Sequence, residues 1–133
     1  MTDIVVLDDS RMLLHFVKSL LKSSYQVVVA SPGSLREALN VLYDEHPAIL
    51  ITDYEMPNLC GESVVRAIWE DANLRDIKVL MLSSHHEQDI ITRVMERGVA
   101  GYILKGGGMK EHLIRRIDEL LAPQADEDGA VTS

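Results

Sequence analysis

Short apolar segments alternate along this chain with segments of helical spacing, and this alternation constrains the fold more than any other feature. The apolar segments are rich in Val, Ile and Tyr and too short for helices, which is typical of buried strands; they cover residues 4–7, 25–30, 48–52, 77–82 and 101–104. Between them apolar residues recur at helical spacing, as from Met109 to Leu121. Because each parallel return needs a crossover, this pattern predicts a parallel sheet covered on both faces. The expected fold class is α/β, with (βα)₅ order.

Three serines mark predicted helix starts. Ser34 and Ser84 are each followed three residues later by Glu, which fits the capping box, and Ser10 is placed to cap the first helix. After Leu121 the chain turns to Ala, Pro, Gln, Asp, Glu, Gly and Ser, with too little apolar surface to offset the entropy of ordering. We therefore expect one domain over residues 1–122, followed by a disordered acidic tail or the stub of a linker over residues 123–133.

The composition is typical of a single soluble domain with an acidic surface. A chain of 133 residues with 47% hydrophobic content can build one core, and its single cysteine, Cys60, has no internal partner for a disulfide. The N-terminus lacks the pattern of a signal peptide and no apolar run approaches the length of a membrane span, so we expect a soluble, cytoplasmic protein without membrane contact. A formal net charge of -8 repels phosphate backbones, which disfavours direct binding of nucleic acid.

Residues suited to phosphoryl chemistry follow four of the predicted strands. In chain order they are Asp8 and Asp9, Asp53, Ser83, and Lys105. The carboxyl ends of parallel strands share one edge of the sheet, where ligands bind in such folds. Three carboxylates without a cation would repel one another, and their hard oxygens suit Mg²⁺ better than Zn²⁺. A lysine and a hydroxyl beside them can stabilise a transferring phosphoryl group, with one carboxylate as nucleophile. Each residue alone is better explained as a loop residue or helix cap, but their joint placement favours a site.

Four motifs in order resemble the bacterial response-regulator receiver family, and the resemblance, with chemotaxis regulators in particular, covers residues 3–121. The motifs are VVLDDSR at residues 5–11, DYEMPNLCG at 53–61, LMLSS at 80–84 and GVAGYILK at 98–105. The resemblance implies a flavodoxin-like, doubly wound five-stranded sheet with strand order 2-1-3-4-5. It also implies a stand-alone module of two-component signalling, phosphorylated by a sensor histidine kinase or a phosphotransfer protein. Such a receiver is not an ordinary enzyme, since it catalyses only its own phosphorylation and dephosphorylation.

The resemblance also assigns roles in the phosphoryl transfer. Asp53 would be the phosphoacceptor, Ser83 would hydrogen-bond the phosphoryl oxygen and Lys105 would pair with the phosphate. Tyr102 would turn inward after phosphorylation, so that Ser83 and Tyr102 act together as a switch. A downstream protein would then bind the face made by the fourth helix, the fifth strand and the fifth helix.

Mg²⁺ is the cofactor that the resemblance implies. Asp9 and Asp53 would bind the ion directly, Asp8 largely through water, and Glu55 through its backbone carbonyl.

Two features depart from the family pattern. In the family a proline in a cis peptide often follows the lysine, whereas Lys105 is followed by three glycines, which predicts a more mobile loop. Glu55 and His85 occupy positions that in the family flank the phosphoryl site and influence the lifetime of the phosphoryl group. Either both side chains point to solvent, or they face each other and a protonated His85 pairs with Glu55 and obstructs the hydrolytic water.

Other functions fit the motifs less well. A phosphatase of the haloacid-dehalogenase type needs D-x-D, whereas Asp53 is followed two residues later by Glu55. A flavin carrier needs a Ser/Thr/Gly-rich phosphate loop after the first strand, and a dinucleotide site needs G-x-G-x-x-G. A degenerate receiver that acts unphosphorylated is disfavoured by the complete set of acidic residues with Ser83 and Lys105.

Overall fold

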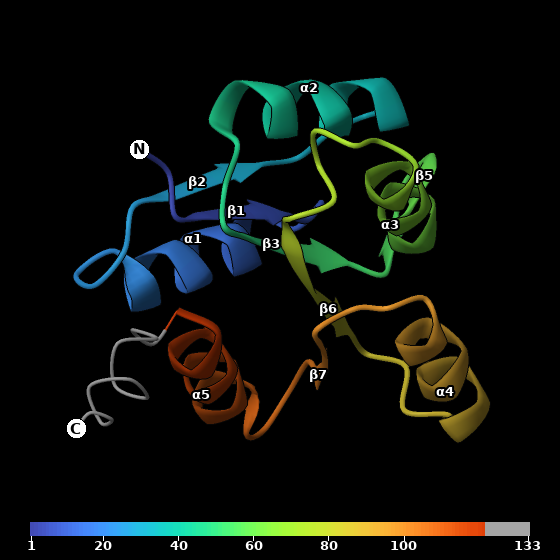
Figure 1. The fold of residues 1–133 in the computed structure, drawn as a ribbon. Helices are drawn as coiled ribbons and strands as arrows, with labels where there is room; N and C mark the ends of the chain where they lie inside the picture. The colour runs from blue at the N-terminus through green and yellow to red at the C-terminus, as the bar shows by residue number, and fades with distance from the viewer. Residues whose placement is uncertain (122–133) are drawn as a thin grey trace, which may run out of the picture.

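The computed structural model of the protein describes residues 1–121 and shows helices on both sides of a central sheet (Figure 1). Its elements in chain order are β1 (Ile4–Leu7), α1 (Arg11–Leu21), β2 (Val27–Ala30), α2 (Leu35–Glu45), β3 (Ile49–Asp53), β4 (Glu55–Met56), β5 (Leu59–Cys60), α3 (Gly61–Trp69), β6 (Lys78–Ser83), α4 (Gln88–Glu96), β7 (Gly101–Leu104) and α5 (Met109–Leu121). The strands predicted from the sequence are therefore confirmed, to within two residues at each end. The predicted tail over residues 123–133 lies outside the described residues.

The central sheet has five strands in the order β2-β1-β3-β6-β7, and all neighbours are parallel. The short strands β4 and β5 form a separate antiparallel hairpin. With this hairpin left out of the numbering, the observed order is the predicted 2-1-3-4-5. The order reverses between β1 and β3, so the carboxyl ends of these two strands form the topological switch point at which ligands bind in such sheets.

Each face of the sheet has its own hydrophobic core. α1 and α5 cover one face, and α2, α3 and α4 cover the other (Figure 1). Along β1 the residues alternate between the two cores: Ile4 and Val6 pack with α1 and α5, whereas Val5 and Leu7 pack on the opposite side. All four are 0% exposed, and burial of such a side chain contributes about 1.5–3 kcal/mol. Burial on both faces is the reason that this strand is a continuous apolar run in the sequence.

Ser10 and Ser34 cap α1 and α2, as predicted. Each side-chain oxygen accepts the backbone N–H of the residue three positions later, at 3.2 Å. The second half of the box at Ser34 differs from the prediction, because the Glu37 carboxylate accepts the N–H of Gly33 and not that of Ser34. A cap of this kind stabilises a helix by about 1 kcal/mol.

The capping box predicted at Ser84 is wrong. α4 begins only at Gln88, with Glu87 at its N-cap and no side-chain hydrogen bond there. The preceding residues are held by other contacts, since the N–H of His85 donates to Ser83 Oγ at 3.0 Å. This contact holds His85 in the loop that follows β6, and the helix starts three residues later.

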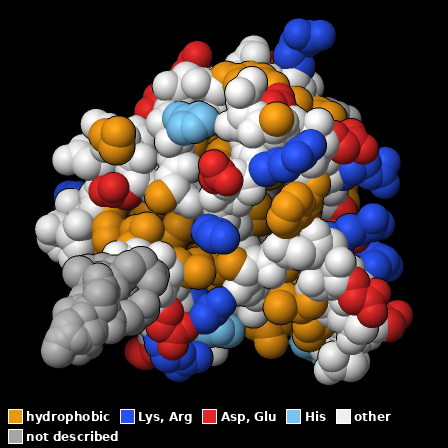
Figure 2. All heavy atoms as spheres, in the orientation of Figure 1, with side chains coloured by type: hydrophobic (Ala, Val, Ile, Leu, Met, Phe, Trp, Pro, Cys, Tyr) orange, Lys and Arg blue, Asp and Glu red, His pale blue; other side chains and the backbone are white. Residues whose placement is uncertain are grey.

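Exposed apolar side chains are spread over several elements. Figure 2 shows separate hydrophobic patches among charged side chains on one face of the molecule. The large exposed hydrophobic residues besides Met1 are Met12, Phe16, Tyr43, Trp69, Met95 and Leu104. None of the helices formed by residues 1–121 is long and apolar enough to cross a membrane.

Candidate metal centre

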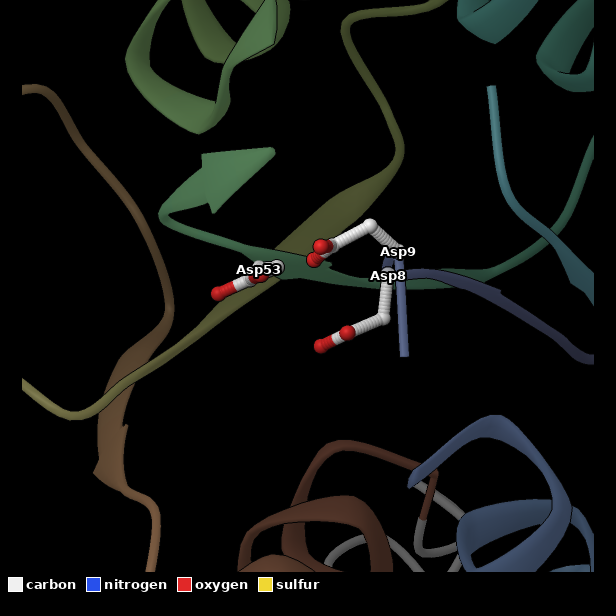
Figure 3. A group of neighbouring side chains, drawn as sticks. All are labelled: Asp8, Asp9 and Asp53. Carbon is white, nitrogen blue, oxygen red and sulfur yellow. The ribbon is translucent and has the colours of Figure 1, made fainter. Parts of the chain in front are cut away.

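Three carboxylates meet at the carboxyl ends of β1 and β3 (Figure 3). Asp8 and Asp9 follow β1 directly, and Asp53 is the last residue of β3. One oxygen atom of each carboxylate lies within 4.8 Å of the other two. Asp8 and Asp53 are buried, at 0% and 5% exposure, whereas Asp9 is exposed. The cluster therefore has two carboxylates inside the protein and a third at its rim.

Asp8 is a buried charge with incomplete hydrogen bonding. Its Oδ1 accepts the backbone N–H of Ser10 at 2.8 Å. Its Oδ2 accepts no hydrogen bond of good geometry, although Lys105 Nζ lies 3.2 Å away, within the distance of an ion pair. A buried carboxylate oxygen with a free lone pair, next to two further carboxylates, suits a hard divalent cation. Because every donor in the group Asp8, Asp9 and Asp53 is a carboxylate oxygen, these residues suit Mg²⁺ better than Zn²⁺.

Lys105 reaches the carboxylates from the end of β7. Its Nζ donates to Asp53 Oδ1 at 3.0 Å, in addition to the contact with Asp8. Burial lowers the pKa of Lys105, but the hydrogen bond to Asp53 and the charges of the two carboxylates outweigh it, so the pKa lies above its ordinary value. The ammonium group is therefore charged at neutral pH.

Asp53 has a strongly perturbed pKa. Burial is the main cause and raises the pKa of Asp53 to about 6. The hydrogen bond from Lys105 lowers this pKa, whereas the negative charge of Asp8 raises it further. A carboxyl group that is perturbed by burial and by specific charges is typical of a functional site.

Ser83 and Tyr102 both contact the loop between β6 and α4. Ser83 is the last residue of β6 and is fully buried. Its Oγ accepts the N–H of His85, and the hydroxyl of Tyr102 donates to the carbonyl oxygen of His85 at 2.8 Å. The two residues of the predicted switch therefore meet at one loop residue. The inward turn of Tyr102 after phosphorylation stays a prediction.

Glu55 and His85 face each other, which is one of the two arrangements left open by the sequence. His85 Nε2 lies 2.9 Å from Glu55 Oε1, and its Nδ1 lies 3.5 Å from Glu87 Oε1. The hydrogen bond to Glu55 raises the pKa of His85 above its ordinary value. The imidazole ring also packs edge-on against Tyr54, with the ring centroids 5.3 Å apart. The structure thus decides between the two arrangements in favour of the contact, and the effect of the contact on phosphoryl lifetime stays a prediction.

The hairpin of β4 and β5 brings backbone close to Asp53. Asn58, at its turn, has a φ of 63°. At its end the N–H of Gly61 donates to the carbonyl oxygen of Tyr54 at 2.8 Å, and a Cβ on Gly61 would lie 2.4 Å from the backbone oxygen of Asp53. Glycine is required at this position because no side-chain atom fits there.

Two of the three glycines after Lys105 adopt conformations that favour glycine. Gly106 has a φ of 121° and Gly108 a φ of 86°, and no peptide bond among residues 1–121 is cis. Nothing lies within 4 Å of a Cβ placed on either residue, so backbone conformation and not crowding accounts for them. The greater mobility of this loop stays a prediction.

A family model identifies the kind of protein. Residues 4–118 match the model described as response regulator receiver domain. The chain belongs to the response regulator receiver family. This receiver is accordingly a component of two-component signalling and not an enzyme in the ordinary sense.

Two relatives and one solved structure are similar to the receiver. The chemotaxis protein CheY of Pseudomonas aeruginosa is 29% identical over 102 residues, which are 77% of this chain and 82% of that protein. The sensor histidine kinase TmoS of Ectopseudomonas mendocina is 27% identical over 126 residues, which are 95% of this chain and 13% of that protein. The structure of the chemotaxis response regulator CheY4 of Vibrio cholerae has a TM-score of 0.79 at 24% identity, covers 91% of this chain and 99% of its own, and shows the same fold.

Sequence reasoning about the receiver missed one group of side chains near the site. Tyr54, directly after Asp53, contacts Glu62 of α3 and Arg93 of α4 through its hydroxyl group. Arg93 is 31 residues from Glu62 in the chain, and no local pattern signals such a pairing.

Proposed function

We propose that Asp53 accepts a phosphoryl group from a phosphohistidine of a sensor histidine kinase or phosphotransfer protein in an Mg²⁺-dependent reaction. The observation that carries this proposal is the cluster in which Asp8, Asp9 and Asp53 meet the ammonium group of Lys105. Membership of the receiver family supports the same reaction. Mg²⁺ would be held directly by Asp9, Asp53 and the backbone carbonyl of Glu55, and by Asp8 largely through water.

The chemistry of this transfer is a displacement at phosphorus. A carboxylate oxygen of Asp53 attacks the phosphorus atom, the bond from phosphorus to the imidazole nitrogen breaks, and the product is an acyl phosphate on Asp53. When bound, the cation supplies neutralising charge to the phosphoryl oxygens. Lys105 Nζ lies 3.0 Å from Asp53 Oδ1, and we expect it to pair with the same phosphoryl oxygens. Ser83 Oγ accepts the N–H of His85 and keeps its own proton available to donate to the phosphoryl group.

Intact-mass measurement after incubation with acetyl phosphate and Mg²⁺ tests this function. We expect the wild-type protein to gain one phosphoryl group, and chelation of Mg²⁺ to prevent the gain. Asp53→Asn should gain none. Asp76→Asn is the control, because it alters an exposed carboxylate in the segment before β6, and it should react like wild type. Equal phosphorylation of Asp53→Asn would contradict the proposal.

We further propose that phosphorylation is read by a downstream protein at the face of α4, β7 and α5. Tyr102 adjoins this face and holds the loop that leads into α4 through its bond to His85. Tyr102→Ala should leave phosphorylation of Asp53 intact and weaken binding of the partner to the phosphorylated protein. Isothermal titration with the partner measures this effect, and unchanged affinity would exclude Tyr102 from the switch.

A further inference from the structure

Three side chains from three different segments form a closed network beside the candidate site. Arg93 of α4 donates to both carboxylate oxygens of Glu62 in α3, at 3.1 and 3.2 Å. The hydroxyl of Tyr54 donates to Glu62 Oε1 at 3.2 Å and accepts a hydrogen bond from Arg93. Arg97, one turn further along α4, adds a contact of 3.4 Å to Glu62 Oε2. Each of the three central side chains thus contacts the other two.

This network is more protected from water than a surface ion pair. The side chain of Glu62 is 15% exposed and Tyr54 is 8% exposed, while Arg93 covers them and is 48% exposed. Burial raises the pKa of Glu62, but the hydrogen bonds from Arg93 and Tyr54 outweigh it, so the pKa lies below its ordinary value. A two-pronged contact between guanidinium and carboxylate also fixes the relative orientation of the two helices.

α4 has a small buried interface with the rest of the protein, since it packs against β7 and contributes only Val94 and the partly buried Ile90 to the core. Val94 is its one buried residue, and no side chain caps its N-terminus. α3 by contrast buries four residues, Gly61, Val64, Val65 and Ile68. The contacts that Arg93 makes with Glu62 therefore add a connection to α3 to the small interface that holds α4 in place.

Tyr54 connects this helix contact to the phosphoacceptor. It follows Asp53 directly, and its N–H donates to the carbonyl oxygen of Leu82 at 3.0 Å, one residue before Ser83. Its ring packs against His85, in the loop that leads into α4. The hydroxyl end of Tyr54 is thus held by α3 and α4, and its backbone end is held by the strands that carry the site.

We propose that Tyr54, Glu62 and Arg93 form a latch that fixes α4 relative to the loop after Asp53 and thereby slows phosphorylation of Asp53. For a phosphoryl group to be bound at Asp53, Lys105 must leave Oδ1, and the β6–α4 loop must adjust as Ser83 turns to the phosphoryl oxygens. That adjustment moves the start of α4, which the latch resists. The three residues are positioning residues, and the inference rests on the proposed function of Asp53.

Rates of phosphorylation by acetyl phosphate with Mg²⁺ test the latch. We expect Glu62→Gln and Arg93→Gln to be phosphorylated about threefold faster than wild type or more, because mutations at coupling contacts change equilibria by roughly two- to thirtyfold. Arg66→Gln in α3 and Glu96→Gln in α4 alter exposed charges of the same helices outside the latch and should react at the wild-type rate. Tyr54→Phe removes only the hydroxyl that joins the helix pair to the Asp53 loop and should be accelerated like Glu62→Gln.

Hydrogen exchange without phosphodonor separates coupling from loss of structure. In Glu62→Gln and Arg93→Gln the amides of α4 should exchange at least about threefold faster than in wild type, while those of β1 and β3 keep their rates. In Tyr54→Phe the ion pair between the helices remains, so α4 should exchange close to the wild-type rate. Trp69, the single tryptophan, gives a second signal, since a Cβ on Gly98 at the end of α4 would lie 3.0 Å from its ring. Its emission should change in Glu62→Gln and Arg93→Gln and not in the two control variants.

The outcomes distinguish the latch from the proposed function. If wild type is phosphorylated but Tyr54→Phe and Glu62→Gln react no faster, the latch is overturned and the function of Asp53 stands. Unchanged exchange of α4 in both charge variants would also overturn it. If wild type is not phosphorylated at all, the proposed function fails, and the inference that depends on it fails with it.

Discussion

Asp53 and Asp8 are two buried carboxylates that share one lysine. The Lys105 ammonium lies 3.0 Å from Asp53 Oδ1 and 3.2 Å from Asp8 Oδ2, so one positive charge faces two negative ones. Burial, with the charge of Asp8 as a smaller contribution, raises the pKa of Asp53 to about 6, and one buried oxygen of Asp8 lacks a hydrogen bond. A divalent cation bound at the carboxylates would favour the charged form of Asp53 and supply a partner for the Asp8 oxygen. The effect of these two carboxylates on stability can therefore be measured without phosphorylation, by removing divalent cations.

Without divalent cations, Asp53 should make the free energy of unfolding depend on pH. Its pKa is about 6 in the folded protein, against 3.8 as the ordinary value. Between these two pKa values the folded protein binds more protons at Asp53 than the unfolded chain does. Protonation of Asp53 therefore stabilises the folded state, and this contribution is complete below about pH 4 and is lost as the pH rises to about 6. The loss amounts to at most about 3 kcal/mol. Urea unfolding in chelator should show the decline in wild type and in Asp76→Asn but not in Asp53→Asn. A decline of equal size in Asp53→Asn would assign it to another group.

At the scale of the elements, the hairpin of β4 and β5 shows how local backbone positions the site. Gly61 starts α3 directly after β5, and its N–H donates to the carbonyl of Tyr54. The close approach of this backbone to Asp53 leaves no room for a side chain, so the glycine of the motif is required by packing around Asp53.

Gly61→Ala should therefore destabilise the protein and displace Asp53. The added Cβ would lie 2.4 Å from the backbone oxygen of Asp53, which cannot move aside as a flexible side chain could. The expected cost is about 2 kcal/mol or more. Gly33→Ala is the matched control, because its Cβ would meet the flexible end of Glu37 at 3.4 Å, and it should change stability by less than about 0.5 kcal/mol. Thermal unfolding compares the two variants, and equal melting temperatures would show that the chain relaxes around Gly61.

The same elements show which parts of the structure could be predicted from sequence. The strands and the meeting of Asp8, Asp9 and Asp53 follow from apolar runs and from the shared edge of parallel strands, which are local and topological properties. The false cap at Ser84 has a different origin: contacts with Ser83 Oγ and Glu55 hold His85 in a loop, and Glu55 is 30 residues away in the chain. Contacts between distant residues leave no periodic signal in a single sequence.

At the scale of the whole molecule, side chains from separate segments meet near Asp53. Glu55 of β4 contacts His85 of the loop before α4 directly, and the ring of Tyr54 packs edge-on against the imidazole. His85 is thereby connected to the hairpin on one side and to Tyr102 on the other, through its carbonyl oxygen. A change in the charge of His85 would act on both connections.

The pairing of Glu55 with His85 should make the lifetime of the phosphoryl group on Asp53 depend on pH. A protonated His85 pairs with Glu55, with Glu87 as a second acidic neighbour, and this pair would obstruct the approach of water to the phosphorus. Because the hydrogen bond to Glu55 raises the pKa of His85, the pair persists above the ordinary imidazole pKa of about 6.5. As the pH rises through the raised pKa, the imidazole becomes neutral, the pair weakens and dephosphorylation should quicken.

Half-lives of the phosphorylated protein between about pH 5.5 and 8 measure this dependence. Wild type and His86→Ala should show the shortening of half-life with rising pH, since His86 is the exposed neighbour of His85. Glu55→Gln and His85→Ala should lack this additional shortening over the same range, because each removes one partner of the pair. Any pH dependence of the hydrolysis itself is common to all four proteins and cancels in the comparison. Parallel profiles in wild type, Glu55→Gln and His85→Ala would show that the pair does not control the access of water to Asp53.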